Sequence, residues 1–257
     1  MRKFIFAVLA AATMSLTGCG LLSNLNPQGV MNAAGDLITA ASITDAQVVE
    51  LSRQSMAYTD AENYILTSGP YVTRLNNLTK NLKVEGLPLN FKVYKTDEIN
   101  AFACGDGSIR IYSGLMDVMD DDQLIAIIGH EIGHVVHQDT KAALKRAYMS
   151  AAAREIAGSV DGTIGVLSNS VLGDLAQQFV EARYSQKQEY AADDYGFQFA
   201  VDNGHDAYSM YSALMKLVEL SGGSTTSSQV YKMFSSHPDS EKRAEKVKAK
   251  ADAMTKK

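Results

Sequence analysis

The sequence is poor in cysteine and, after its first 18 residues, in long apolar runs. Its 257 residues include two cysteines, Cys19 and Cys104. If Cys19 is acylated, as its surroundings predict below, Cys104 has no partner in the chain and an intramolecular disulfide is excluded. No segment after residue 18 reaches the roughly 18 consecutive apolar residues that a membrane span requires.

The chain also lacks an excess of positive charge. It carries 24 Lys and Arg against 29 Asp and Glu, which gives a formal net charge of −5. Its most basic stretch, residues 241–257, mixes both signs at helical spacing, as is typical of a solvated helix face. Nothing in the sequence therefore indicates a nucleic-acid partner.

The N-terminus is organised like an export signal. Arg2 and Lys3 precede an apolar run from Phe4 to Leu16, which is too short to span a bilayer and long enough for a signal-peptide core. Residues 1–18 are therefore predicted to be a signal peptide that is removed from the mature protein.

The residues at the end of this signal predict a lipid anchor. Leu16-Thr17-Gly18-Cys19 is similar to the lipobox at which bacteria acylate a cysteine and cleave before it. Cys19 is thus the predicted lipidation site, and residues 19–42 are a predicted tether to the membrane. Gly20, rather than Asp, follows the cysteine, which by resemblance to enterobacterial lipoproteins favours export to the periplasmic face of the outer membrane. The alternative is an ordinary secretory signal, in which Cys19 is incidental.

The run His130-Glu131-Ile132-Gly133-His134 carries the strongest chemical signal. Residues four apart share one face of a helix, so His130 and His134 can direct their rings at one metal ion, with Glu131 beside them. An apolar stretch from Asp120 to His137, which starts with candidate capping residues, supplies the helix. The alternative is a pair of hydrogen-bonded core histidines.

A catalytic zinc site needs a third protein ligand. A metzincin would require glycine at position 137 and histidine at position 140, where this chain has His137 and Thr140. Glu189 is the better candidate, in a helical pattern over residues 175–201. Asp193, four residues later, is predicted to accept the second ring N–H of a ligand histidine. The alternative for both carboxylates is a solvated acidic face.

These residues predict a zinc-dependent endopeptidase with one Zn²⁺ per chain. Zinc held by His130, His134 and Glu189 would lower the pKa of its bound water to about 7. Glu131 would take the proton and later pass it to the leaving amine. A structural zinc site is disfavoured, because such sites are usually closed by four Cys or His ligands.

Five motifs, in the same order, resemble those of the gluzincin peptidases that include bacterial HtpX and the CAAX-prenyl proteases. They are Asn100–Ala103, Ile109–Gly114, His130–His134, Glu189 with Asp193, and His237-Pro238 with Arg243. The likeness is greatest to the LoiP-type lipoprotein branch, from which Gln138 and Gln186 depart. The resemblance implies a zincin-like metalloprotease domain, predicted over residues 43–257.

The secondary-structure pattern predicts an α+β fold that is mainly helical, with a small antiparallel sheet. Gly105-Asp106-Gly107 indicates a hairpin between two of the short β-type runs. The predicted strands are Phe91–Thr96, Ile99–Ala103 and Ser108–Tyr112, and the predicted helices are residues 44–66, 71–82 and most of the chain after Asp120.

The motif Asn100, Ala101, Phe102 and Ala103 is predicted to be an exposed edge strand that pairs with the backbone of a substrate. The alternative is a purely structural strand. Edge pairing requires an extended chain, so unfolded or misassembled cell-envelope proteins are the predicted substrates and partners. The alternative function is a catalytically silent chaperone-like or scaffold lipoprotein that binds unfolded chains.

Two further regions leave several roles open. By resemblance, His237 and Arg243 approach the cleft. His237 would stabilise the oxyanion as a catalytic residue, contact substrate as Arg243 does, or occupy the open zinc position; it is otherwise a surface residue. Residues 141–180 predict either a lid over the cleft or a packed helical hairpin.

Overall fold

The computed structural model describes residues 44–154, 173–177, 183–222, 231–238 and 240–256. The predicted signal peptide (1–18), the lipidation site Cys19 and the tether (19–42) lie outside the described residues. Residues 155–172 and 178–182, which belong to the predicted lid or hairpin, lie outside them too.

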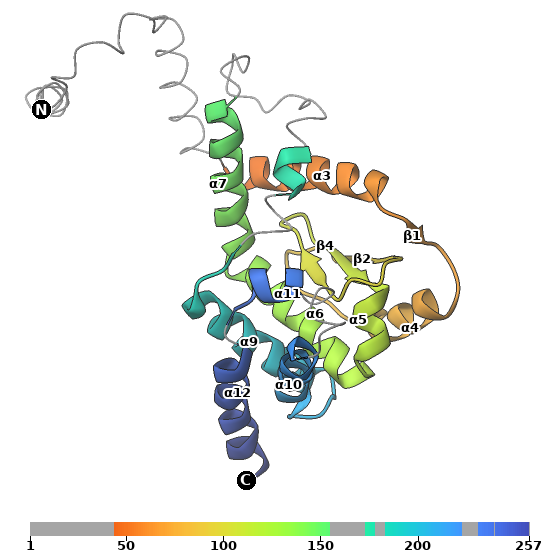
Figure 1. Cartoon of the computed structure of the whole chain (residues 1–257), viewed down its shortest axis with the longest axis vertical. Helices are drawn as coiled ribbons and strands as arrows, with labels where there is room; N and C mark the ends of the chain where they lie inside the picture. The colour runs from red at the N-terminus through yellow and green to blue at the C-terminus, as the bar shows by residue number, and fades with distance from the viewer. Residues whose placement is uncertain (1–43, 155–172, 178–182, 223–230, 239, 257) are drawn as a thin grey trace, which may run out of the picture.

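A four-stranded sheet lies at the centre of the described part of the chain (Figure 1). Its strands are β1 (Ile65–Leu66), β2 (Asn90–Tyr94), β3 (Ala101–Ala103) and β4 (Ser108–Tyr112). The predicted hairpin joins β3 to β4, with Cys104 N–H donating to Ser108 O at 2.8 Å. Gly107 in its turn has a φ of +87°, and a Cβ there would lie 2.2 Å from Pro88 O, so the turn requires glycine.

The α+β class is confirmed, but the sheet is mixed where a purely antiparallel one was predicted. β1 pairs antiparallel with β2, and β3 with β4, whereas β2 and β4 run parallel. The reason is that β4 inserts between β2 and β3 after the hairpin, which gives the order β1-β2-β4-β3. β3 is left at one edge of the sheet.

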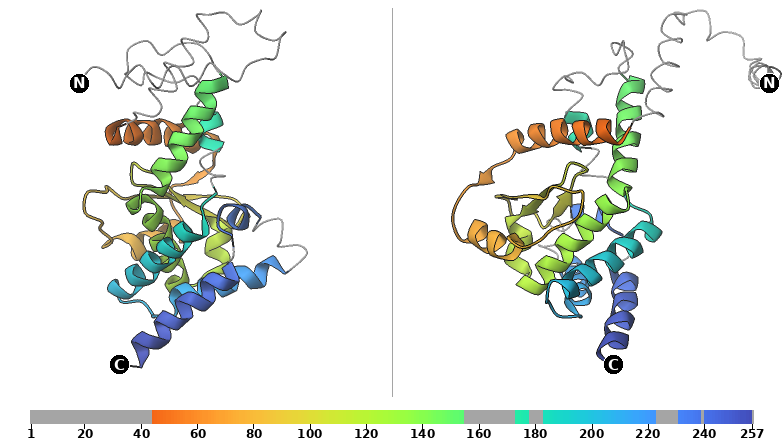
Figure 2. Two further views of the ribbon diagram at one scale, coloured as in Figure 1. Left: turned by 90° about the vertical axis from the view of Figure 1, so that its left-hand side faces the viewer. Right: turned by 180° about the vertical axis from the view of Figure 1, so that it is seen from behind.

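Helices cover both faces of the sheet (Figures 1 and 2). Alternate side chains of the strands pack with Met56 of α3 on one face and with α6 on the other. The predicted helix over 44–66 ends early, because Ile65 and Leu66 pair with β2. The described helices are α3 (Asp45–Glu62), α4 (Pro70–Thr79), α5 (Ser113–Val118), α6 (Asp121–Val136), α7 (Asp139–Arg154), α9 (Gln186–Asp202), α10 (Ser209–Ser221), α11 (Tyr231–Ser236) and α12 (Ser240–Thr255).

Helices α6 and α9 pack with their backbones almost in contact. A Cβ at Gly196 of α9 would lie 2.7 Å from Ala126 O, and one at Gly133 of α6 would lie 3.1 Å from Ala192 Cα. Larger side chains at these two positions would force the helices apart. Because the two backbones are so close, side chains from α6 and from α9 can reach one common point between the helices.

A buried ion pair fastens α3 to the sheet. Arg110 of β4 is 2% exposed and donates to both carboxylate oxygens of Asp60, at 2.8 and 3.0 Å. Burial raises the pKa of Asp60, but hydrogen bonds from Arg110, Lys92 and Tyr94 outweigh it and lower the pKa to about 2. The carboxylate therefore stays charged at neutral pH, and α3 is held across the face of the sheet.

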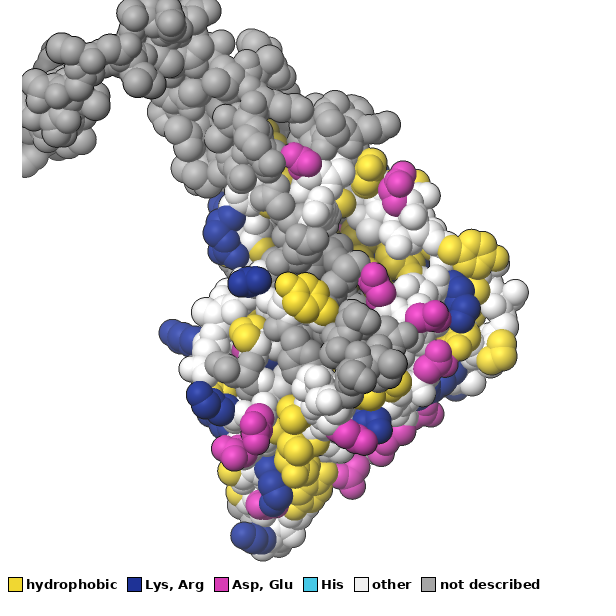
Figure 3. Space-filling model, in the orientation of Figure 1, with side chains coloured by type: hydrophobic (Ala, Val, Ile, Leu, Met, Phe, Trp, Pro, Cys, Tyr) yellow, Lys and Arg dark blue, Asp and Glu magenta, His cyan; other side chains and the backbone are white. Residues whose placement is uncertain are grey.

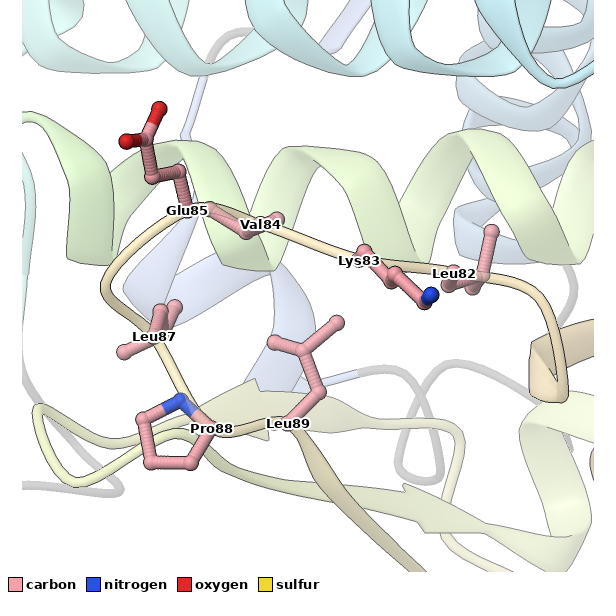
Figure 4. A pocket seen from close by; sticks show the side chains of 7 residues that line it. All are labelled: Leu82, Lys83, Val84, Glu85, Leu87, Pro88 and Leu89. Carbon is pink, nitrogen blue, oxygen red and sulfur yellow. The ribbon is translucent and has the colours of Figure 1, made fainter.

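The described surface is mixed in charge and also exposes large hydrophobic side chains such as Tyr64 and Tyr231. Figure 3 shows acidic and basic side chains interspersed over the face that it presents. A groove of about 530 Å³ follows the loop between α4 and β2 (Figure 4); it is lined by residues between Leu82 and Leu89 and contains none of the predicted site residues. None of the described helices is long and apolar enough to cross a membrane.

Candidate metal centre

The two histidines of α6 face the same point. A capping box starts the helix, with Asp120 accepting from Gln123 N–H at 2.8 Å, and the turns that carry His130 and His134 are buried. The two Nε2 atoms are 3.2 Å apart. The helix that the apolar pattern predicted therefore presents both imidazoles to one position.

Glu189 reaches this position from the first turn of α9. Its side chain is 0% exposed. Oε1 lies 3.3 Å from His134 Nε2, and Oε2 lies 3.6 Å from His130 Nε2. Two helices that are distant in sequence thus bring the three predicted ligands together.

His237 joins the cluster from the end of α11. Its Nδ1 lies 3.2 Å from His130 Nε2 and 3.1 Å from Glu189 Oε1. One ligand atom from each of these four residues lies within 4.8 Å of all the others. His237 therefore lies close enough to the three predicted ligands to be a fourth ligand of the same metal ion.

The donor atoms have the spacing that zinc requires. Tetrahedral zinc, with bonds of about 2.0–2.1 Å, holds its ligand atoms roughly 3.3–3.4 Å apart. Among the three predicted ligands, the two Nε2 atoms are 3.2 Å apart, and they lie 3.3 and 3.6 Å from the nearer oxygens of Glu189. In their neutral forms, the rings of His130 and His134 each donate Nδ1–H to a carboxylate, so their Nε2 lone pairs face one another. In that form both Nε2 lone pairs are free to bind one metal ion.

Asp193 holds the Nδ1 side of the His130 ring, and Arg243 in turn holds Asp193. Asp193 Oδ1 lies 2.9 Å from His130 Nδ1, as predicted for a carboxylate that orients a ligand. Arg243 of α12 holds Asp193 with two hydrogen bonds of 2.6 and 2.7 Å and lies 2.6 Å from Glu189 Oε2. Arg243 is 2% exposed, so its guanidinium is engaged by two carboxylates. Its predicted contact with substrate stays a prediction.

Sequence reasoning missed the carboxylate that orients His134. Asp139 Oδ2 lies 3.0 Å from His134 Nδ1, and Gln188 donates to Asp139 Oδ1 at 2.6 Å. The chain turns back through Gln138, whose φ of +62° is left-handed and costs a non-glycine residue about 1–2 kcal/mol. An acidic residue just beyond the helix was the only signal in the sequence.

Aromatic packing also shields His134. The ring of Tyr184 stacks on it with centroids 3.9 Å apart and an angle of 14° between the planes. Tyr184 N–H donates to Ser236 O at 3.3 Å, which joins the segment before α9 to the end of α11. Tyr184 was not predicted, because its place depends on the packing of two distant segments.

The surrounding charges move the pKa values of the cluster in different directions. Burial lowers the pKa of His130, with the Asp193 carboxylate opposing it. Burial also disfavours a charged His134, but Asp139 and Glu189 outweigh it and raise the pKa to about 9. Burial raises the pKa of Glu189, yet His237 and His134 hold it well below its usual range. A metal that binds here therefore displaces a proton from His134.

Glu131 has an unfilled hydrogen-bonding position. It is 3% exposed, and its Oε1 has no hydrogen-bond partner among the described residues. The nearest ring nitrogen is His237 Nε2 at 3.6 Å. An unpaired buried acceptor costs about 1–3 kcal/mol, so this oxygen is placed to receive a hydrogen bond from a water molecule or a substrate.

The predicted substrate strand lies at the edge of the sheet, but the prediction that it is exposed is wrong, because each of its residues is at most 6% exposed. Ala101 and Ala103 pack into the main core with α6. Asn100 is 2% exposed and hydrogen-bonds through its side chain to Tyr112. The two other described histidines lie elsewhere: His137 contacts Tyr195, and His205 Nδ1 lies 2.6 Å from Asp122.

Comparison with known proteins identifies the family. The model of "Peptidase family M48" matches residues 70–251. The chain belongs to peptidase family M48. It is 35% identical to metalloprotease LoiP and 34% identical to metalloprotease YcaL, both of Escherichia coli K12, with 96–98% of this chain and 96–97% of each relative covered. It is 27% identical to a protease HtpX homolog of Tropheryma whipplei, which covers 95% of this chain and 94% of that protein.

This M48 peptidase is a zinc metalloprotease, as its ligands and its family together establish. His130, His134 and Glu189 would hold the metal, which would supply a Lewis acid and make a water molecule acidic near neutral pH. Glu131, with its unpaired Oε1, is placed to accept a proton beside them.

Replacing the third ligand, Glu189, should weaken zinc binding more than replacing Asp193. Glu189→Ala should release zinc at concentrations where the wild type retains it, because a protein ligand is lost. Asp193→Asn should weaken zinc affinity by roughly 10–100-fold, because all three ligands remain and only the orientation of the His130 ring is disturbed. Competition with a chromophoric chelator measures both. Asp194→Asn is the control, since Asp194 pairs with Lys250 away from the ligands. Unchanged affinity in Glu189→Ala would place the third ligand elsewhere.

Replacing His237 should open the metal centre. His237→Ala keeps the three predicted ligands, so zinc content should stay near one per chain and turnover of an unfolded substrate should rise. His205→Ala is the control, because His205 contacts Asp122 outside the cluster. A fall in turnover of roughly 10²–10³-fold, with little change in KM, would contradict a blocking role and assign His237 to the oxyanion.

Proposed function

We propose that this M48 peptidase cleaves unfolded or misassembled proteins of the cell envelope, which it binds as extended chains along β3. The observation that carries the proposal is the position of β3: it packs against the helix that bears His130 and His134, and no described strand pairs with its outer edge. A strand edge binds any chain that can adopt an extended backbone.

The register of β3 determines which backbone groups meet the substrate. Tyr112 N–H donates to Asn100 O, and Cys104 N–H donates to Ser108 O, so alternate residues of this segment pair inward with β4. In an antiparallel pair the intervening residues direct their N–H and C=O groups outward. Ala101 and Ala103 are those residues, and their two N–H and two C=O groups are the proposed contacts.

This geometry supports a peptidase that selects its substrates because they are unfolded and not because of their sequence. The side chains of Ala101 and Ala103 point into the core, so the proposed contacts involve backbone alone and discriminate weakly between sequences. Both residues are at most 2% exposed, so the backbone of this strand must be uncovered before a substrate can pair with it. Only an unfolded segment offers a free strand for this.

We also propose that the mature protein is anchored by lipid on Cys19 at the periplasmic face of the outer membrane. The support is the lipobox-like sequence before Cys19 and the glycine that follows it. A tether of residues 19–42 would reach at most roughly 80 Å when extended, which lets the peptidase act on chains well beyond the membrane surface.

Cleavage of casein by wild type and by Glu131→Gln tests the proposed activity against the chaperone-like alternative. The variant should retain about one zinc per chain and still bind unfolded casein, while cleavage falls by on the order of 100-fold or more, because no carboxylate accepts the proton. A chelator should stop the wild type. Equal cleavage by the variant would contradict the role of Glu131. Zinc-loaded wild type that binds casein without cutting it would favour the chaperone.

Mass spectrometry of the mature N-terminus tests the anchor. The wild type should begin at an acylated Cys19 and fractionate with the outer membrane, whereas Cys19→Ser should remain unprocessed or mislocalised. Cys104→Ser is the control, because Cys104 is buried and its acylation is not expected. An unmodified Cys19 in the processed wild type would reduce the proposal to a periplasmic protein.

A further inference from the structure

The segment after α6 places a carboxylate against the back of His134. Asp139 is 7% exposed and lies 3.0 Å from His134 Nδ1. It reaches this position because Gln138 takes up a left-handed conformation directly after the helix. A turn of this kind at a non-glycine residue persists only where its surroundings hold it, and it occurs often beside functional sites.

A single side-chain amide connects Asp139 to the helix that carries Glu189. Gln188 Nε2 donates to Asp139 Oδ1 at 2.6 Å. Its Oε1 accepts from the backbone N–H of Ser185 at 2.9 Å, and this bond is half of the capping box that starts α9. The amide therefore has two separate functions: its oxygen completes the cap, and its nitrogen fixes the carboxylate.

The two α6 histidines are supported in different ways. Asp193, behind His130, is paired with the guanidinium of Arg243. Among the described residues, the only ion pair of Asp139 is with His134 itself, and its other hydrogen bond comes from the neutral Gln188. In the part of the chain that the structure describes, no Lys or Arg forms an ion pair with Asp139 and competes with His134 for its negative charge.

We propose that Asp139 and Gln188 are a positioning pair that fixes the tautomer and direction of His134 and locks it to the start of α9. The side chains of His134 and Glu189 are then held at a fixed position relative to each other before metal binds. Asp139 directs the ring so that Nε2 faces the ligand cluster, and Gln188 keeps Asp139 from turning away. The proposal concerns metal binding and does not depend on the proposed substrate.

The variant Gln188→Glu separates the two functions of the amide. Glutamate still accepts the capping bond from Ser185, but it loses the donor and sets a second carboxylate against Asp139. In the full-length protein, zinc affinity should fall by roughly 10–100-fold, and the visible spectrum of the cobalt-substituted protein should change. The metal-free protein should still unfold cooperatively, because the cap is kept, although repulsion between the two carboxylates should lower its unfolding temperature.

A matched control lies on the same helix. Gln198 Nε2 donates to Asp202 Oδ1 at 2.7 Å on the exposed side of α9, so Gln198→Glu makes the same chemical change away from the cluster. Zinc affinity and the cobalt spectrum of this variant should match the wild type. An equal loss in Gln198→Glu would attribute the effect to added charge on α9 and overturn the proposal.

A second substitution should rescue the first. With Asp139→Asn added to Gln188→Glu, the asparagine amide can donate to the carboxylate introduced at position 188 while its oxygen still accepts from His134. The double variant should bind zinc at least about tenfold more tightly than Gln188→Glu alone, whereas Asp139→Asn alone should bind more weakly than wild type. Wild-type zinc affinity in Gln188→Glu, or losses that simply add in the double variant, would overturn the proposal.

Discussion

The close approach of α6 and α9 is the constraint on which the metal centre depends. Gly133 and Gly196 let the two backbones almost touch, and the core around them is filled by the apolar residues of both helices. At this separation a glutamate on one helix reaches the imidazoles of the other. The fold beneath the cluster is therefore rigid, and the ligand positions follow from helix packing rather than from loops.

Charge balance is the second constraint on the site. Glu131, Asp139, Glu189 and Asp193 are all buried within one small region, where Arg243 is the only described Lys or Arg with an ion pair to them. Uncompensated buried charges cost several kcal/mol each, so this arrangement is stable only with further positive charge. Asp139 and Glu189 raise the pKa of His134 to about 9, so a protonated His134 supplies part of this charge in the metal-free site, and a bound divalent ion would take its place.

Features set by local sequence were predictable. The spacing of the α6 histidines, and of Glu189 and Asp193 on α9, follows from the helical repeat alone. Contacts that depend on how distant segments meet were not: β4 inserts between two earlier strands, and the position of Asp139 requires a left-handed turn at Gln138. The ion pairs of Arg243 with Glu189 and Asp193 likewise depend on the packing of α12 against α9, which the sequence alone does not determine.

Anomalous diffraction at the zinc edge, on crystals of the zinc-loaded protein, tests the central claim most directly. The account predicts one strong peak per chain, about 2.0–2.2 Å from His130 Nε2, His134 Nε2 and an oxygen of Glu189. A zinc-loaded crystal whose peak lies away from these three atoms, or whose peak is ligated by only one of the two helices, would contradict it.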